Sequence, residues 1–371
     1  MVIREHTWAD LEAAIGQDFS DAEERVAVEA VEWTGIRRFC EVIELGCPLH
    51  WDEAVARAHG YRGAVLPVSA VNSSYTSGGV WKPGNPTRWD VKDTHALVHR
   101  ESAPTGPQVP MPATTAGFAT DIEIEYLEPV CVGDRLTVKG RKLVSVTLRE
   151  TSVGYGAFTV YESYISNQRG EQVAIQRNGS YSYNPHPPEK LAQTRGQGGE
   201  TRRSSEGDGR LSPAEREELA RTKPPRSDWS EQRYWEDVKE GDAVPPVGLN
   251  ITVQRLVMEA GANRDFAPIH HDTVLTQRQG VEEMYMNNIF VQAMWERTVR
   301  EYIGVAGRIR KVGPFRMRVF NQAGYTVATR GRVAKKWQQD GQNLVELEIW
   351  SENDRGVSVG PGPVLVSLPL H

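Results

Sequence analysis

Asp265 and His270 are the two side chains whose types and spacing best suit acid/base chemistry. They stand at the two ends of the segment Asp-Phe-Ala-Pro-Ile-His, in which Pro268 has no amide hydrogen and disfavours helix at Ala267. The segment should therefore form an extended turn that aims both end groups into one pocket. A carboxyl and an imidazole so placed could take a proton from beside a carbonyl and protonate a departing hydroxyl, provided that burial raises the aspartate's pKa. The pattern predicts a dehydration or its reverse.

Taken alone, a carboxylate and an imidazole in one loop are more typical of a structural ion pair. The position of the segment favours catalysis, because it lies between an expected strand, Leu249 to Val257, and an expected helix that begins near Asp272. His270, His271 and Asp272 could also be considered as metal ligands. Adjacent residues seldom point at one ion, so we expect no metal, a solvent-facing His271 and an N-cap role for Asp272.

The turn occurs twice. Pro-Leu-His-Trp-Asp at 48–52 and Pro-Ile-His-His-Asp at 268–272 are 220 positions apart, which predicts two related domains. Five residues before its histidine, the first copy carries Leu45 where the second has Asp265. His50 therefore lacks an acid partner, and the first copy is interpreted as a retained structural turn.

With 371 residues, the chain is long enough for two domains and a linker. The boundary is a stretch dominated by Pro, Gly, Ser, Arg and Glu, a composition that cannot bury enough surface to order itself. We assign residues 1–185 to an N-terminal domain, 186–227 to a flexible linker and 228–371 to a C-terminal domain. Ser212 to Glu215 resembles a capping box, which predicts a short solvated helix inside the linker.

Each half contains segments rich in Val, Ile, Tyr and Thr and separated by turn residues, which predicts consecutive antiparallel strands. One helix, Ile289 to Ile303, precedes the strands of the second half, whereas the matching region 69–115 contains many prolines and predicts a reduced helix. The fold class is α+β. The expected strands are Asp121–Tyr126, Arg135–Val146, Phe158–Asn167 and Glu171–Tyr183, then Phe315–Phe320, Thr326–Trp337, Leu344–Asn353 and Val364–Leu370.

Composition excludes several classes of protein. A net charge of -6 argues against a general nucleic-acid or anionic-membrane binder. Three cysteines without CxxC spacing suggest neither a disulfide framework nor a thiolate zinc site. No apolar run is long enough for a signal core or a membrane span. We expect a cytoplasmic protein.

The motif Asp-x-x-Pro-Ile-His, preceded by Trp235-Glu236-Asp237-Val238 and Gly241-Asp242, resembles the MaoC-like hydratases and (R)-specific enoyl-CoA hydratases. That resemblance covers both halves. It implies a double hot dog, with two antiparallel sheets each wrapping a helix, a degenerate N-terminal copy with a reduced central helix, and Asp265 and His270 as the catalytic pair. The double arrangement is the one that the family uses for bulky acyl groups.

The chain departs from the family pattern at three places. Arg264 replaces the usual Gly before the aspartate, Ala267 replaces Asn, and Asn287-Asn288 stand where the family has His-Gly. The glycine amide of the family polarises the thioester carbonyl. The amide of Asn288 or Ile289 could supply that oxyanion donor at the helix N-terminus, although the Asn288 side chain could equally be only an N-cap.

Basic residues follow the second-half helix and could meet the phosphates of coenzyme A or of an acyl-carrier arm. Their alternation with apolar residues is equally typical of a half-exposed strand. The cluster consists of Arg308, Arg310, Lys311, Arg316 and Arg318.

The predicted function is a hydro-lyase that reversibly hydrates or dehydrates the 2,3 bond of an acyl thioester, carried by coenzyme A or by an acyl-carrier protein. His270 acts as base towards the α-carbon and Asp265 as acid towards the β-hydroxyl. No cofactor is implied beyond the coenzyme A or phosphopantetheine of the substrate. The fold is compatible with a homodimer. Two alternatives remain: a hot-dog thioesterase and a non-catalytic acyl-thioester binding subunit.

Overall fold

The strands form one continuous antiparallel sheet. The computed structural model describes residues 5–73, 80–96, 105–151, 153–187, 210–222, 225–278 and 281–371. Ten strands in this part of the chain follow the order β1-β3-β4-β5-β2-β7-β10-β9-β8-β6. They are β1 (Arg25–Val26), β2 (Ala116–Tyr126), β3 (Leu136–Glu150), β4 (Gly154–Asn167), β5 (Gln172–Pro185), β6 (Ala243–Asn250), β7 (Arg308–Arg316), β8 (Thr326–Gln339), β9 (Gln342–Asn353) and β10 (Gly356–Ser367).

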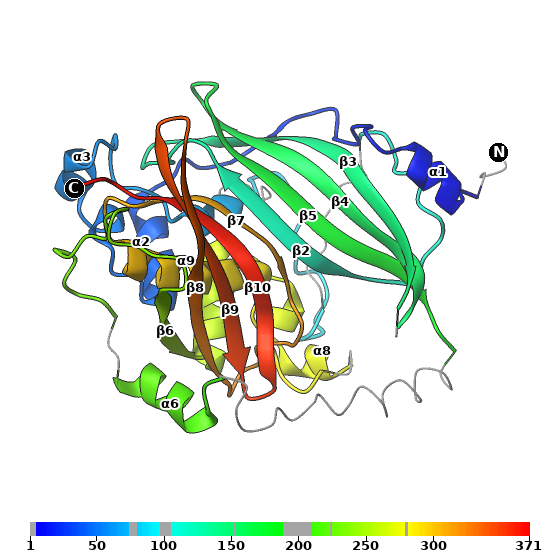
Figure 1. The fold of residues 1–371 in the computed structure, drawn as a ribbon. Coiled ribbons are helices and arrows are strands. Elements are labelled where there is room, and N and C mark those ends of the chain that lie inside the picture. Colours follow the sequence, from blue (N-terminus) through cyan, green and yellow to red (C-terminus); the bar gives the residue numbers. More distant parts are fainter. Residues whose placement is uncertain are drawn as a thin grey trace.

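The sheet order is symmetric about its centre. Five strands come from each half, and β2 pairs with β7 to join the two halves edge to edge. In Figure 1 the green strands of the first half therefore continue directly into the orange and red strands of the second. The expected α+β double hot dog is confirmed, with its two sheets joined into one.

The helices lie against the sheet and between its halves (Figure 1). α-Helices are α1 (Trp8–Ala13), α2 (Trp33–Ile43), α3 (Glu53–Ala58), α6 (Pro213–Thr222), α7 (Val253–Asn263), α8 (Thr273–Arg278) and α9 (Asn288–Ile303). Short 3-10 turns are η1 (Pro48–His50), η2 (Val68–Asn72) and η3 (Pro268–His270).

Helix α9 is the central helix of the second half and is buried along most of its length. Trp295 is fully buried, donates its indole N–H to Ser351 Oγ at 2.9 Å and packs against Phe315. Burial of such a large aromatic side chain is a major source of hydrophobic stabilisation. The helix also buries polar side chains, including Glu296 and Arg300, so its surroundings must supply partners for them.

The reduced helix of the first half is confirmed in the described residues. There η2 occupies the place that α9 takes in the second half, and the described residues that follow, 80–96 and 105–115, contain neither helix nor a named strand. Residues 74–79 and 97–104 of that region lie outside the described residues.

The internal repeat is longer than its sequence motif. Helix α2 lies 220 positions before α7, η1 before η3 and α3 before α8. Both long helices end on a residue in the left-handed region, Glu44 with φ 54° and Arg264 with φ 61°. A left-handed residue after a helix satisfies orphan carbonyls and redirects the chain, which here leads into the histidine turn.

Several strand predictions were wrong in their bounds. The expected strand Val364–Leu370, for example, is β10, which runs from Gly356 to Ser367. The expected strand Leu249 to Val257 ends at Asn250, because Thr252 caps α7 by accepting the Arg255 amide at 3.1 Å. Leu256 and Ala260 are buried at helical spacing, a pattern that outweighs the β-branched valines. The expected strand Phe315–Phe320 is also displaced. The observed strand β7 begins at Arg308 and ends at Arg316.

Helix α6 lies in the segment assigned to the linker, of which 188–209 and 223–224 are outside the described residues. Ser212 and Glu215 form the expected reciprocal cap, with Ser212 N–H donating to Glu215 at 2.7 Å. The helix is not simply solvated, however. It packs on the edge strand β6, where a side chain at Gly248 would clash with the backbone of Ala220, and Arg216 is buried against Asp354. Covering an edge strand prevents unwanted strand pairing.

Among the described helices, none is both long and apolar enough to cross a membrane.

We expect the central junction to hold both halves in one folding unit. Ile124 on β2 is fully buried opposite Val312 on β7, so Ile124→Ala should destabilise the protein by about 2–5 kcal/mol in a single cooperative transition. Urea denaturation followed by far-UV circular dichroism measures this change. The same substitution at the half-exposed Ile15 should change stability by less than about 1 kcal/mol. Separate transitions for the two halves would contradict the expectation.

Candidate functional site

The structure brings Asp265 and His270 together. The turn between α7 and α8 places His270 Nε2 3.7 Å from Asp265 Oδ2. That separation is too long for a direct hydrogen bond and leaves both atoms able to contact a third group. The imidazole is 10% exposed and the carboxylate 33% exposed, so the pair lies at the border of the interior.

A backbone carbonyl fixes the tautomer of His270. Its Nδ1 lies 2.8 Å from the Tyr285 carbonyl oxygen, which can only accept a hydrogen bond. Nδ1 therefore carries the proton, and Nε2 presents a lone pair towards Asp265. Burial lowers the pKa of His270, while the Asp265 carboxylate acts in the opposite direction. The result is a neutral imidazole whose basic Nε2 is directed at the Asp265 carboxyl.

The turn also fixes the orientation of Asp265. Its amide donates to Asn263 Oδ1 at 2.8 Å, and its own Oδ1 accepts the Ala267 amide at 3.3 Å. Oδ2 is the oxygen left for chemistry. Arg264 adopts the left-handed conformation in which Gly is favoured, and its guanidinium lies 5.4 Å from the centre of the Phe266 ring. The replacement of Gly by Arg264 is thus tolerated without loss of the turn.

Asn287, rather than Asn288, caps α9. The Asn287 side chain accepts the Phe290 amide at 2.9 Å, and Asn288 is already the first helical residue. Among the described residues, no acceptor binds the amides of Asn288 or Ile289. The first amides of a helix point out of its N-terminus, where they favour negative charge. This geometry keeps both predicted oxyanion donors available.

Glu259 is a buried acidic residue beside the pair that sequence reasoning missed. It lies on the inner face of α7, is 3% exposed, and accepts a hydrogen bond from the Asn263 side chain. Burial raises its pKa well above the usual range, and the negative charge of Asp265 adds to that rise. The available signal was its spacing of three and four residues from Leu256 and Asn263, which places all three on the buried face of one helix.

The first copy of the turn has the same backbone but a closed interior. His50 Nδ1 lies 2.8 Å from the Val65 carbonyl, and burial lowers the pKa of His50 to about 3. Leu45 occupies the aspartate position and is fully buried. His50 is thus held as a neutral residue of the core, which supports its interpretation as structural.

Glu296 of α9 fills the place where the first copy would bind an oxyanion. Its carboxylate accepts the amides of Val68 and Ser69, each at 2.8 Å, and the Ser69 hydroxyl at 2.5 Å. Val68 and Ser69 lie 220 positions before Asn288 and Ile289. The same pair of helix-start amides is therefore neutralised internally in one half and left available in the other.

The predicted phosphate-binding residues do not form one cluster. Arg308 and Arg316 lie at opposite ends of β7, roughly 25 Å apart at the usual rise per residue. Lys311 pairs with Glu123 at 3.0 Å and Arg316 with Asp121 at 3.6 Å, while Arg318 donates to the Gly360 carbonyl at 2.6 Å. Arg308 stacks over Tyr61, and Arg310 is half-buried. A single phosphate group cannot contact the whole set.

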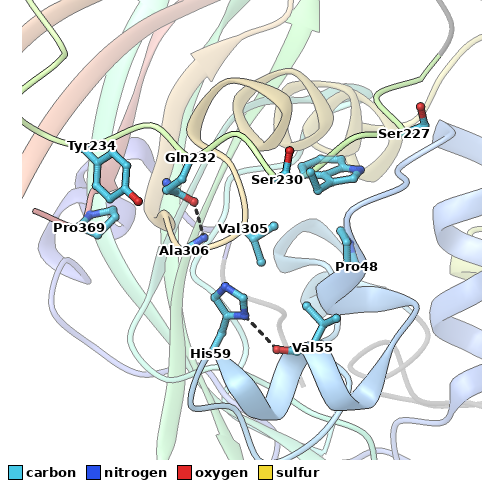
Figure 2. Close-up of a pocket in the computed structure, with 11 residues that line it drawn as sticks. Pro48, Val55, His59, Ser227, Ser230, Gln232, Tyr234, Val305, Ala306 and Pro369 are labelled. Atoms are coloured by element: carbon cyan, nitrogen blue, oxygen red, sulfur yellow. Dashed lines mark hydrogen bonds between the residues drawn. The ribbon is translucent and has the colours of Figure 1, made fainter. Parts of the chain in front are cut away.

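A cavity of about 550 Å³ lies beside the first copy of the turn, and neither Asp265 nor His270 is among its lining residues. Figure 2 shows Pro48, Val55 and His59 of that copy on one side of it and Ser230, Gln232 and Val305 on the other. The His59 ring bonds the Val55 carbonyl at 2.9 Å, within its own helix. We assign the cavity no chemistry, because neither Asp265 nor His270 lines it.

Comparisons with known proteins find relatives that are named as dehydratases and hydratases. Residues 13–176 match the family model described as FAS1-like, dehydratase domain region. A probable enoyl-CoA hydratase alpha subunit of Thermomonospora curvata is 26% identical over 188 residues, which cover 49% of this chain and 54% of that protein. The chain thus spans about half the length of the curated relative that it matches.

Solved structures share the fold along almost the whole chain. A MaoC-like dehydratase has a TM-score of 0.64 at 16% identity and covers 97% of this chain and 100% of its own. A putative MaoC domain dehydratase from Chloroflexus aurantiacus gives 0.62 at 10% identity, with 96% of each chain covered. A Mycobacterium tuberculosis protein described as a double hot dog gives 0.54 at 10%, covering 95% of this chain and 96% of its own. At these identities the likeness shows the fold.

We expect His50 to contribute to acid sensitivity. The pKa of His50 is about 3 in the folded protein, against 6.5 for an ordinary histidine. At pH values between these two, the unfolded chain binds a proton at His50 that the folded chain does not. Stability should fall as the pH drops through this window, by up to about 1.4 kcal/mol per pH unit from this group. His50→Asn should flatten the profile of urea midpoints between about pH 6 and pH 4. The exposed His59→Asn should leave the slope unchanged, and parallel profiles for wild type and His50→Asn would refute the assignment.

Proposed function

We propose that this chain, a MaoC-like double hot dog by its fold, reversibly hydrates the 2,3 double bond of an acyl thioester. The observation that carries the proposal is the basic Nε2 of a neutral His270 held 3.7 Å from Asp265 Oδ2. The dehydratase family match and the hydratase name of the Thermomonospora relative support the reaction class. The activity of the whole protein is inferred from these together.

In the dehydration direction, His270 Nε2 takes the proton from the α-carbon and the electron pair moves into the thioester as an enolate. Protonated Asp265 then gives its proton to the β-hydroxyl, which leaves as water while the 2,3 double bond forms. Hydration reverses each step, so Asp265 accepts a proton from the attacking water and protonated His270 delivers one to the α-carbon. After dehydration the proton on His270 Nε2 passes to the Asp265 carboxylate, which restores a neutral imidazole and a protonated acid for the next turnover.

The start of α9 is suited to stabilise the enolate. The amides of Asn288 and Ile289 have no acceptor among the described residues, and the 16-residue helix adds a positive end to its dipole there. Donors placed before the reaction begins stabilise a developing oxyanion without reorganisation. Tyr285, whose carbonyl orients His270, lies only a few residues before these amides, so base and donors share one backbone segment.

The acyl group is proposed to be bulky. Tyr285 stacks on Phe320 with ring centres 4.2 Å apart, and its ring also meets the His270 imidazole edge to face at 5.3 Å. Phe266 and Phe320 are both nearly half exposed next to the pair. Exposed aromatic surface at a reactive centre favours an apolar ligand. The reduced first-half helix removes material that a single hot dog would place against the sheet.

The proposal extends to the acyl carrier, the compartment and the assembly of the protein. Coenzyme A or phosphopantetheine enters with the substrate, and we propose no further cofactor and no metal. The phosphates of that carrier are proposed to meet basic residues singly, through Arg308 or Arg310 at the start of β7, instead of through all five. The cytoplasm is the proposed compartment, and a homodimer is the proposed assembly.

The direct test is hydration of a panel of enoyl-CoA thioesters, from short linear to bulky cyclic, followed by loss of conjugated-thioester absorbance. Asp265→Asn and His270→Asn should each lower kcat by about 10²–10⁴-fold, because each removes one proton-transfer group. Circular dichroism checks that both variants fold. Asp237→Asn and His59→Asn, the same substitutions at exposed positions, should remain at the wild-type rate.

Three other outcomes discriminate among functions. Release of free thiol by wild type would indicate a thioesterase. Binding of the panel without turnover would indicate an acyl-thioester binding subunit. Full activity in Asp265→Asn would show that the reaction proceeds without this carboxylate and would overturn the proposed pair.

A further inference from the structure

We propose that Glu259 is a positioning residue whose buried carboxyl joins Asn263 and Asn287 and so fixes the Asp265 turn against the start of α9. The inference deepens the proposed hydratase function and rests on it. It concerns a side chain that the mechanism above leaves unused, although it lies in the interior directly behind the acid.

The first connection runs from Glu259 to the catalytic turn. The Asn263 side-chain amide donates to the Glu259 carboxyl, and Asn263 Oδ1 accepts the Asp265 amide at 2.8 Å. Asn263 is 1% exposed, so its orientation is set by these two partners and not by water. Because the Asn263 side chain bonds Glu259 through its nitrogen and Asp265 through its oxygen, the position of Glu259 affects the position of the Asp265 backbone.

The second connection runs from Glu259 to α9. The Asn287 side chain lies beside the same carboxyl and favours its charged form, while Asn287 Oδ1 caps α9 through the Phe290 amide at 2.9 Å. Glu259 Oε2 and Asn287 Nδ2 are both buried and have no ordinary hydrogen-bond partner among the described residues. Buried polar atoms of this kind are expensive unless they meet each other or an ordered water. Glu259 therefore links the helix that carries the oxyanion donors to the turn that carries the acid.

The first copy of the repeat offers a comparison within the same chain. At the positions 220 residues earlier, Phe39, Ile43, Leu45 and Pro67 replace Glu259, Asn263, Asp265 and Asn287. Phe39, Ile43 and Leu45 are buried, so the fold tolerates an apolar side chain at those three places. The Glu and both Asn residues are absent together with the catalytic aspartate, which links them to the chemistry and not to the fold.

The protein interior favours the neutral form of the Glu259 carboxyl. Burial raises its pKa, and Asp265 on the following turn is the charged group that faces it among the described residues. Asn263 and Asn287 are uncharged, and Arg255, one turn earlier on α7, is directed at Val42 and Glu44 instead. A protonated carboxyl can donate and accept at once, whereas a second carboxylate next to Asp265 would repel it.

Two substitutions separate positioning from simple packing. Glu259→Gln keeps a neutral group of the same shape and should retain kcat for enoyl-CoA hydration within about 3-fold. Glu259→Leu leaves both Asn side chains without this partner, so kcat should fall about 10–100-fold with little change in KM. Glu282→Gln, an exposed glutamate, is the control and should match wild type.

Each contrary result overturns a stated part of the inference. Wild-type kcat in a folded Glu259→Leu would rule out positioning. An equal loss in Glu259→Gln and Glu259→Leu would show that the ionised carboxylate is required. If wild type turns over none of the thioesters, the proposed hydratase function fails, which is a different result from an active wild type with an unaffected Glu259→Leu.

The pH dependence of stability tests the neutral carboxyl without any substrate. Because the folded pKa is raised, the stabilising effect is complete below the ordinary value of 4.5 and is lost as the pH rises towards the folded pKa. Glu259→Gln does not titrate, so its urea midpoint should rise relative to that of wild type as the pH increases above the ordinary value of 4.5. Parallel midpoints above that pH would contradict a raised pKa for Glu259, and would count against the inference even if Glu259→Leu fails to fold.

Discussion

The hydrogen bond from a buried histidine to a backbone carbonyl fifteen residues later is the constraint on which the site depends. In the second half His270 donates to Tyr285, and in the first half His50 donates to Val65 at the same distance of 2.8 Å. The bond selects the tautomer, turns Nε2 away from the backbone and ties the histidine turn to the start of the next helix. Base and oxyanion donors are therefore placed by one contact, in keeping with the general role of fixed second partners in orienting a reactive imidazole.

The two copies of the histidine turn differ in the residues that surround the histidine and the helix-start amides. In the first, Leu45 stands at the aspartate position and is fully buried, and the Glu296 carboxylate accepts the two helix-start amides. In the second, Asp265 stands opposite His270, and the amides of Asn288 and Ile289 have no acceptor among the described residues. Glu296 lies in the middle of α9, and the amides of Asn288 and Ile289 lie at the N-terminus of the same helix, so one element contributes to both copies.

The continuous sheet explains how one chain can hold two unequal halves in register. Pairing of β2 with β7 joins them through backbone hydrogen bonds, and the core runs through that junction around Ile124 and Val312. Among the described residues, η2 stands in the first half where the long helix α9 stands in the second. The joined sheet thus carries two unequal halves, and the geometry of the Asp265 turn belongs to the second.

The sequence by itself determined the repeat, the α+β class, the proximity of Asp265 to His270 and the capping roles of Asp272 and Ser212, because each depends on local spacing and turn chemistry. It could not place α7, since valines at 253 and 257 favour a strand until the burial of Leu256 and Ala260 is known. Nor could it show that Glu259 and Glu296 are buried, that Asn287 is the cap, or that the basic residues of β7 are spread along a strand. Those outcomes depend on which surfaces meet across more than 200 residues, and only tertiary packing decides that.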